Sequence, residues 1–269
     1  MSANFDNPDS LGLAAFGQVQ ALLGQIPALR RKPHEHVKAP VSLLKYADEQ
    51  AVVSIAAVFH AIHDFGLHDT DFTNWGVVAA PRFLGRETCV IFLDRFARQG
   101  PLGTSPLLAV YQSLHAVSGS VSLALHIHGP NMGVGGGHRA LEQTLLAGLA
   151  MQSEHQLPGI WMVFSEWDPE AVPDGSCKVS ASGICRALCL AFKPVSASWQ
   201  GLRLRLRPGT VGAGPSKEEH DEPSLAGLGE FLAGQSAAGT NRWHCPLSWN
   251  GRLELTTECH SQAHPILAA

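Results

Sequence analysis

The stretch that decides the fold reads PLGTSPLLAVYQSLHAVSGSVSLALHIHGPNMGVGGGHRALEQTLLAGLAM at residues 101–151 and LPGIWMVFSEWD at 157–168. A short apolar strand, Met132–Val134, runs directly into three glycines. Residues Arg139–Gln152 then repeat leucines at helical spacing, which predicts a helix with one apolar side. Gly159–Phe164 is a continuous apolar run, typical of a strand that is buried on both faces. This strand–helix–strand order predicts a layered α/β fold with parallel pairing.

The same alternation of helices and strands extends to both sides of this stretch. Apolar residues at helical spacing predict a long helix over 41–66, and Gly76–Pro81 is expected to be a buried strand. We expect further helices at Leu11–Leu23, 87–98, 106–126 and around Phe231, and further strands at 184–192, 202–207 and as a closing pair within 243–257, which carries Trp243 and Trp249. The Gly-, Pro- and charge-rich residues 208–223 predict a mobile loop.

The composition excludes several classes of protein. Hydrophobic residues make up 45% of the chain and charged residues 16%, with a formal net charge of −4. The chain is therefore too apolar for a disordered protein and too weakly charged for a non-specific grip on nucleic acid. No apolar run approaches the length of a bilayer span, and Met1–Ser10 does not resemble a secretory signal. We expect a cytoplasmic protein with reduced cysteines, whose sparse charge suggests that a protein partner covers part of its surface.

A second set of landmarks lies within the same stretch. Ser105-Pro106 opens an expected helix that ends at Gly129-Pro130-Asn131, and the strand through Val134, the helix from Arg139 and the strand Ile160–Phe164 follow in order. In this order, residues 45–195 resemble the N-terminal half of the β-ketoacyl synthases. The motifs Ser113-Leu114-His115-Ala116 and Glu166-Trp167-Asp168-Pro169 are similar to a short synthase-like family that accompanies true synthases in aryl polyene and related type II polyketide clusters.

The resemblance implies a fold and a division of the chain. The fold is the thiolase-like layered α/β/α/β/α arrangement, truncated here to one half plus a short divergent C-terminal part. Residues 1–40 are then a lead-in, 41–200 the synthase-like domain, and 201–269 a divergent extension that contains the loop 208–223.

The resemblance also implies that the catalytic nucleophile is missing. In the family, a cysteine sits at the start of a buried helix, whose N-terminus lowers the pKa of the thiol and promotes acyl transfer. The corresponding position holds His138, which follows Gly135-Gly136-Gly137, and no Cys or Ser lies between 123 and 152. The two histidines of the family's C-terminal half have no counterpart beyond a distant echo at Gly239-Thr240-Asn241. We therefore expect a non-catalytic synthase, with Ala116, Gly119 and Met132 beside His138 in the pocket of the missing nucleophile.

A non-catalytic synthase implies a partner, as in a chain length factor that assists an active β-ketoacyl synthase in fatty acid or polyketide elongation. Thiolase-like proteins dimerise by joining strands into a continuous sheet, and the resemblance implies Ile160–Phe164 or the strand around Val134 as that interface. The partner is then an active synthase or a second copy of this chain. Two alternatives remain: an enzyme of altered acyl chemistry that uses His138 or His115 as acid/base or acyl acceptor, and a module whose Arg30, Arg31 and Lys32 bind acyl carrier protein.

Other clusters of chemically active residues have structural explanations, and we expect no metal or cofactor. His126 and His128 suit a helix end before Gly129 better than a metal site. His60, His63, Asp64, His68, Asp69 and Asp71 form the densest set of possible zinc ligands, although an exposed helix end is the commoner explanation. Cys185 and Cys189 do not have zinc spacing and are expected as buried thiols.

The glycines before Arg139 and the acidic pair at the end of 157–168 are equally ambiguous. Gly133–Gly137 could cradle a phosphate at a helix start, but the lysine of a P-loop is missing. Glu166 and Asp168 could form a pair of catalytic carboxylates, but an Asp before proline is usually a turn residue.

Overall fold

The computed structural model describes residues 10–36, 44, 45, 47–105, 111–135, 137–170, 172, 174, 183–196, 199–208, 223–234, 242–249 and 251–257. The strands are β1 (Ser10–Leu22), β2 (Gly76–Pro81), β3 (Asn131–Gly133), β4 (Ile160–Asp168), β5 (Ile184–Pro194), β6 (Leu202–Arg207), β7 (Arg242–Pro246) and β8 (Arg252–Thr257). The α-helices are α1 (Ile26–Arg31), α3 (Glu49–Asp64), α4 (Arg86–Gln99), α6 (His115–Leu125), α7 (Ala140–His155) and α8 (Leu225–Ala233), and two short 3₁₀ turns are η1 (Leu23–Gln25) and η2 (Pro101–Gly103).

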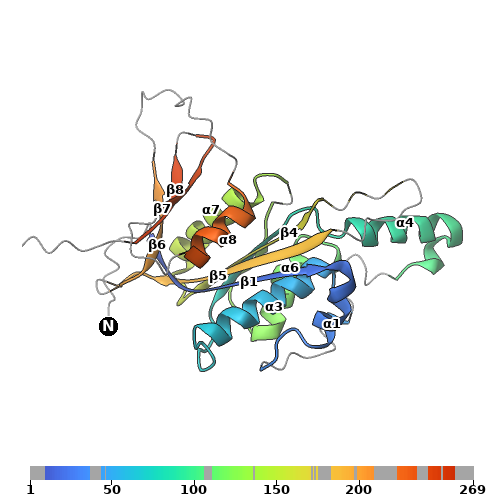
Figure 1. Cartoon of the computed structure of the whole chain (residues 1–269), viewed down its shortest axis with the longest axis horizontal. Helices are drawn as coiled ribbons and strands as arrows, with labels where there is room; N and C mark the ends of the chain where they lie inside the picture. Colours follow the sequence, from blue (N-terminus) through green and yellow to red (C-terminus); the bar gives the residue numbers. More distant parts are fainter. Residues whose placement is uncertain are drawn as a thin grey trace, which may run out of the picture.

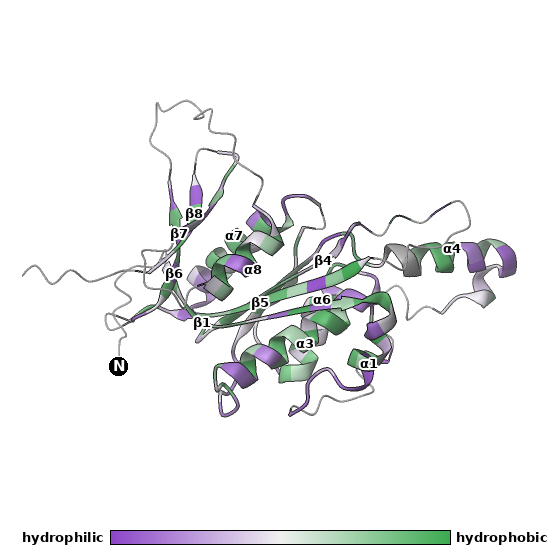
Figure 2. Ribbon diagram, viewed as in Figure 1, coloured by the Kyte–Doolittle hydropathy of each residue, from purple (hydrophilic) through white to green (hydrophobic). Residues whose placement is uncertain are grey.

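One eight-stranded sheet, in the order β3-β2-β4-β5-β1-β6-β8-β7, organises the chain, and helices cover both of its faces (Figure 1). Helices α3, α6 and α1 lie on one face, where Trp75, Trp161 and Val117 belong to the apolar core. Helices α7 and α8 lie on the other face, over a second core that includes Leu145 and Leu228. Green, hydrophobic residues predominate along the central strand β5 (Figure 2). This arrangement of one sheet between two helix layers agrees with the truncated thiolase-like fold.

The expectation of parallel pairing is correct for only three strands. β2 pairs in parallel with β3 and with β4, whereas β4–β5, β5–β1, β1–β6, β6–β8 and β8–β7 are all antiparallel. The sequence does not distinguish the two cases, because a central strand covered by helices on both faces is a continuous apolar run whichever way its neighbours point.

The expected helix at Leu11–Leu23 is wrong: this segment is β1, which pairs along most of its length with β5. Gly17 of β1 explains why helix α3 packs so closely on this strand. A Cβ atom at Gly17 would lie 2.1 Å from the carbonyl oxygen of Ala57, so α3 approaches the β1 backbone as closely as a missing side chain permits. β1 therefore belongs to the same sheet as the strands of 41–200, and β6, β8 and β7 continue that sheet beyond residue 201.

Two of the predicted helices are shorter than expected. α3 begins at Glu49 rather than near 41, because the carboxylate of Asp48 accepts the backbone N–H of Gln50 at 2.8 Å and caps the helix. It ends at Asp64, and Gly66 follows with a φ of +64°. α6 begins at His115 rather than 106, and residues 106–110 lie outside the described part of the chain.

The other predicted elements are confirmed within a few residues of their expected ends. They are the strands at 76–81, 132–134, 159–164, 184–192 and 202–207, the closing pair β7–β8, the helices at 87–98 and 139–152, and the short helix with Phe231. Most of the expected loop, residues 209–222, lies outside the described residues. No helix within the described ranges has both the length and the apolar character needed to cross a membrane.

Candidate functional site

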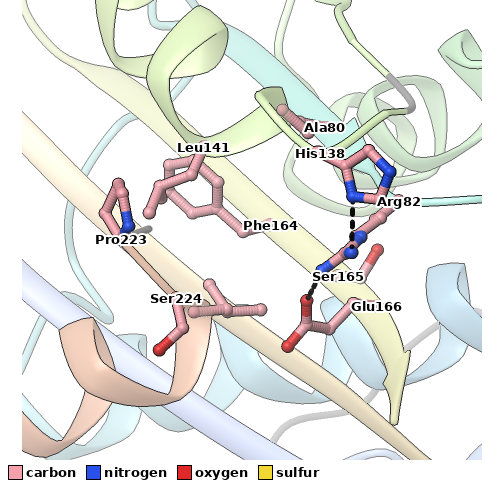
Figure 3. Close-up of a pocket in the computed structure, with 11 residues that line it drawn as sticks. Ala80, Arg82, His138, Leu141, Phe164, Ser165, Glu166, Pro223 and Ser224 are labelled. Carbon is pink, nitrogen blue, oxygen red and sulfur yellow. Dashed lines mark hydrogen bonds and ion pairs between the residues drawn. The ribbon is translucent and has the colours of Figure 1, made fainter. Parts of the chain in front are cut away.

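A small hollow, partly open to solvent, lies where β2 and β4 end and where α7 and α8 begin (Figure 3). Arg82 follows β2, Glu166 stands near the end of β4, and His138 precedes the first turn of α7. The remaining walls are largely apolar and are contributed by Ala80, Ala140, Leu141, Phe164, Pro223 and Leu225, with Ser165 and Ser224 completing the lining. The position implied for the family's nucleophile is therefore in this hollow, at the start of a helix.

Arg82 joins the polar residues of the hollow into a chain. Its Nη2 donates to Nδ1 of His138 at 3.0 Å, and its Nη1 lies 3.4 Å from a carboxylate oxygen of Glu166. Because a guanidinium only donates, Nδ1 of His138 must accept, and the ring proton of the neutral imidazole resides on Nε2. This tautomer has no free lone pair on either ring nitrogen with which to take a proton from a substrate. The geometry therefore does not favour His138 as a general base.

Glu166 is the acidic residue of the hollow, and most of its side chain is shielded from solvent. Its side chain is 13% exposed, and burial raises the pKa of its carboxyl, although the positive charge of Arg82 opposes that shift. The backbone of the neighbouring residue fixes Arg82 as well, because the Arg82 N–H donates to the carbonyl of Ser165 at 2.7 Å. Asp168 does not form a carboxylate pair with Glu166, since it is bound by Arg186 at 2.6 Å. The acidic pair of the sequence thus consists of two separate ion pairs.

The cysteines that the structure describes do not supply a thiolate. Cys185 and Cys189 lie buried in β5, as expected, and burial raises the pKa of both thiols. Cys245 on β7 is electrostatically coupled to Glu142 and Arg139 at the first turn of α7, but burial raises its pKa to about 12. Cys89 on α4 is also shifted upward, mainly by burial. All four are therefore thiols at neutral pH.

Of the residues expected in the pocket, the structure places only His138 in this hollow. His115, Ala116 and Gly119 lie in the first turns of α6, where Nδ1 of His115 is 3.2 Å from the Ser118 hydroxyl. Met132 lies in β3 and is 43% exposed. Gly135 has a φ of +75°, Gly137 leads into His138, and Gly136 is outside the described residues.

Of the two strands expected at a dimer interface, one is excluded by its position in the sheet. Ile160–Phe164 cannot extend the sheet, because β4 is hydrogen-bonded to β2 on one side and to β5 on the other. β3, by contrast, pairs only with β2 among the described strands and is one end of the sheet. The alternative, the strand around Val134, remains the prediction.

Three histidines of the histidine-rich run join His34 and His36 in a cluster of rings. The rings of His34, His36, His60, His63 and His68 approach one another, with neighbouring centroids 4.7–5.8 Å apart. No group of three or more His, Cys, Asp or Glu residues in the described ranges is arranged to hold a metal ion. His126, with a φ of +54°, ends α6, as the helix-end explanation of this residue requires. Arg30 is occupied by the carbonyls of Leu44 and Ala47, at 2.5 and 2.6 Å.

Arg82, the central residue of the hollow, belongs to no motif that stands out in the sequence. It follows Pro81 directly at the end of a buried strand, a place where functional side chains are common in α/β folds. That position was the available signal. Its partner Glu166 is 84 residues away, and only the parallel pairing of β2 with β4 brings them together.

Solved structures with the same fold are ketosynthases and chain length factors. A chain of the ketosynthase of Xenorhabdus doucetiae in complex with its chain length factor has a TM-score of 0.56 and 13% identity, covering 92% of this chain and 99% of that one. A β-ketoacyl synthase from Burkholderia phymatum STM815 has a TM-score of 0.53 and 12% identity, covering 84% of this chain and 69% of that one. The ishigamide ketosynthase/chain length factor has a TM-score of 0.50 and 14% identity, covering 74% and 67%.

Comparisons of the sequence with protein-family models and with curated proteins give no match. The likeness is therefore one of structure, and it agrees with the landmarks from Ser105 to Phe164 that carried the resemblance. Sheet, helix layers and neighbours together show that the chain has the thiolase-like fold of ketosynthases and chain length factors.

Proposed function

We propose that this chain is a non-catalytic, ketosynthase-like subunit that pairs with an active β-ketoacyl synthase and assists chain elongation in a polyketide or fatty acid pathway, as a chain length factor does. The observation that carries the proposal is His138. It stands just before α7, where the resemblance implies a nucleophilic cysteine, and Arg82 occupies its Nδ1. The position of His138 therefore offers no nucleophile to which an acyl group could be transferred.

The chemistry of the surrounding cysteines supports the same proposal. A ketosynthase needs a thiol whose pKa is lowered by the helix N-terminus. Cys245, which interacts electrostatically with the first turn of α7, has instead a pKa raised to about 12 by burial. At neutral pH only a vanishing fraction of such a thiol is ionised, so it is no substitute nucleophile.

The structural neighbours support a role beside a ketosynthase. The matched chain in the Xenorhabdus doucetiae complex is covered to 99%, so a chain of comparable length occurs in an assembly of a ketosynthase with its chain length factor. The Burkholderia phymatum synthase is covered to only 69%. We infer that the active partner joins the sheet at β3.

The direct test is to co-express this chain with a cysteine-containing ketosynthase of a type II pathway and to incubate the purified pair with an acylated carrier protein. Intact-mass spectrometry should find the acyl group on the ketosynthase alone. His138→Ala should leave elongation by the pair unchanged within about twofold. A covalent acyl adduct on this chain, or acyl transfer by this chain in the absence of the partner, would instead establish the alternative of an enzyme with altered chemistry.

A further inference from the structure

Arg82 has hydrogen-bonding capacity that its neighbours do not use. Its contact with Glu166 is 3.4 Å long, whereas a close charge-assisted hydrogen bond measures about 2.7–2.9 Å. Its Nε is buried and has no hydrogen-bond partner among the described residues. A guanidinium offers five N–H donors in a planar fork, and the contacts with His138 and Glu166 account for only two of its three nitrogens. Arg82 is thus held in place by its neighbours without being saturated by them.

The hollow around Arg82 has a polar side and an apolar side. Figure 3 shows Arg82, His138 and Glu166 grouped together, while Leu141, Phe164 and Pro223 lie opposite them. Most of its space is open to solvent, so a ligand would lie along its walls rather than be enclosed by them. The partial positive charges at the starts of α7 and α8, which both border the hollow, further favour a negative group.

We propose that this hollow binds a short aliphatic carboxylic acid, whose carboxylate takes the fork of Arg82 and whose hydrocarbon tail lies against Leu141, Phe164 and Leu225. The proposal goes beyond a partner role and does not depend on it, because all the residues that form the hollow come from this chain. Arg82 is the group that contacts the ligand; His138 is a positioning residue, whose Nδ1 holds the guanidinium toward the hollow.

Glu166 couples this binding to a proton. A bound carboxylate and an ionised Glu166 compete for the same guanidinium. Burial already raises the pKa of Glu166; the charges of Arg82 and Arg186 oppose this shift, and that of Asp168 adds to it. The simplest balance is that Glu166 takes up one proton from solution when the ligand carboxylate binds and occupies Arg82. The affinity should then rise as the pH falls from 7.5 to 5.5, as long as the ligand itself remains ionised.

Isothermal titration of the purified chain with butyrate, hexanoate and hexanamide tests the proposal. Saturable 1:1 binding of hexanoate is expected, about tenfold tighter than butyrate because each buried methylene strengthens binding by roughly three- to fourfold. Hexanamide should bind at least tenfold more weakly, since it lacks the charge that Arg82 recognises. No saturable binding of hexanoate, or equal binding of acid and amide, would overturn the proposal.

Variants separate Arg82 from a general ionic effect. Arg82→Gln should weaken hexanoate binding at least tenfold, and Arg82→Lys should weaken it less, because it keeps the charge but loses the fork. Glu166→Gln should tighten binding several-fold at pH 7.5 and abolish the pH dependence, which a merely structural residue would not do. Arg98→Gln on α4, which removes an exposed arginine outside the hollow, is the matched control and should change nothing.

Circular dichroism confirms that each variant is folded before titration. If Arg82→Gln does not fold, Glu166→Gln and Arg82→Lys still decide the question, because unchanged affinity in both would refute the site. Pairing with a ketosynthase is measured separately by co-purification. If the chain binds hexanoate but does not pair with a ketosynthase, only the proposed function is overturned. If it pairs with a ketosynthase but does not bind hexanoate, only this inference is overturned.

Discussion

Glu254, in the middle of β8, is a buried carboxylate between arginines. It is 3% exposed, and Nε of Arg252 and of Arg207 lie 2.5 and 3.5 Å from its oxygens. Burial acts to raise the pKa of Glu254, but the hydrogen bond from Arg252 and the charges of Arg242 and Arg207 hold it below its ordinary value. Glu254→Gln removes the charge that both arginines contact, so it should lower the free energy of unfolding at pH 7. The loss should be only about 1–2 kcal/mol, because both arginines are half exposed and solvent screens their charges.

The sign of the pH effect follows from the lowered pKa of Glu254. Its stabilisation is fully present above the unfolded pKa of about 4.5 and is lost as the pH falls through the lower, folded pKa. Urea denaturation of wild type and Glu254→Gln at pH 7 and pH 3 should show the difference shrinking at acid pH. Glu230→Gln, at an exposed position on α8, is the control. A difference that stays constant with pH would contradict this role of the charge.

His34 is the most buried member of the ring cluster, at 8% exposure. Desolvation and the charges of His60, His63 and His36 lower its pKa, and Asp64 opposes them. Because the unfolded chain then binds the proton more readily, the cluster should cost stability as the pH falls below about 6.5. His34→Phe should reduce the fall in Tm between pH 7.5 and pH 5.5 by a few degrees, because each kcal/mol of unfolding free energy corresponds to about 2–4 °C in Tm. His155→Phe, exposed on α7, should reproduce the wild-type fall; an equal fall in all three proteins would refute the prediction.

Single residues also show where sequence reasoning ends. His138 could be placed at the start of a helix because Gly135 and its neighbours precede a clear leucine repeat. Arg82 and Glu166 could not be paired, because their contact depends on the register Pro81↔Ser165 between two parallel strands. Nothing local to either residue encodes that register.

At the scale of elements, the packing of α3 on β1 depends on Gly17. A Cβ there would be 2.1 Å from the oxygen of Ala57 and 2.8 Å from the nitrogen of Ala61, both backbone atoms that cannot rotate away. Gly17→Ala should therefore destabilise the fold by about 3 kcal/mol. Gly24→Ala is the matched control, because no atom lies within 4 Å of its added Cβ, and it should change stability by less than about 1 kcal/mol. Similar thermal midpoints for the two variants would contradict this packing.

The N-terminus of α3 gives a second prediction at this scale. Asp48 is 3% exposed, and burial, followed by the charge of Glu49, raises its pKa well above the ordinary value. A carboxyl with a raised folded pKa costs stability increasingly as the pH rises through that pKa. Asp48→Asn keeps an N-cap oxygen for Gln50 and removes the charge, so it should raise the free energy of unfolding at pH 7 by about 1 kcal/mol.

Asp48→Ala separates the two contributions in the same chemical denaturation experiment. It removes the buried charge and the cap together, so it should be about 1 kcal/mol less stable than Asp48→Asn. If Asp48→Asn were instead the less stable of the two, the cap geometry at Gln50 would not be the reason for the aspartate.

The predicted elements succeeded where local pattern decides the structure and failed where partners decide it. The leucines of α7 and the alternation Leu202–Arg207 of β6 carry their own period. β1 does not, because its apolar residues are divided between the two cores: Leu11, Leu13 and Phe16 pack in one, and Ala15 and Ala21 in the other. The start of α3 was predicted too early because the cap at Asp48 outweighed the apolar residues before it.

For the whole molecule, the two ends of the described sheet differ in charge. β7 carries Arg242 and His244, and charged side chains protect an edge strand from pairing with another chain. β3 carries only Asn131, Met132 and Gly133 and has no such protection. The sparse charge of the chain, which suggested a covered surface from composition alone, is therefore matched by an uncharged edge. α4 adds exposed apolar residues, Ile91, Leu93 and Phe96, that the sequence did not mark.

If the ketosynthase joins the sheet at β3, a charge on that edge should weaken the pair. Met132→Lys places an ammonium at the uncharged end, and we expect at least a tenfold loss of affinity for the ketosynthase in surface plasmon resonance, with an unchanged Tm. Trp249→Lys is the matched control: its side chain is 52% exposed, against 43% for Met132, but it lies beside the opposite edge. Equal affinity for both variants would remove β3 from the interface. A loss of affinity confined to Trp249→Lys would instead place the interface at the β7 end of the sheet. The partner would then have to complement the charges of Arg242 and His244, and these charges would not serve to repel another chain.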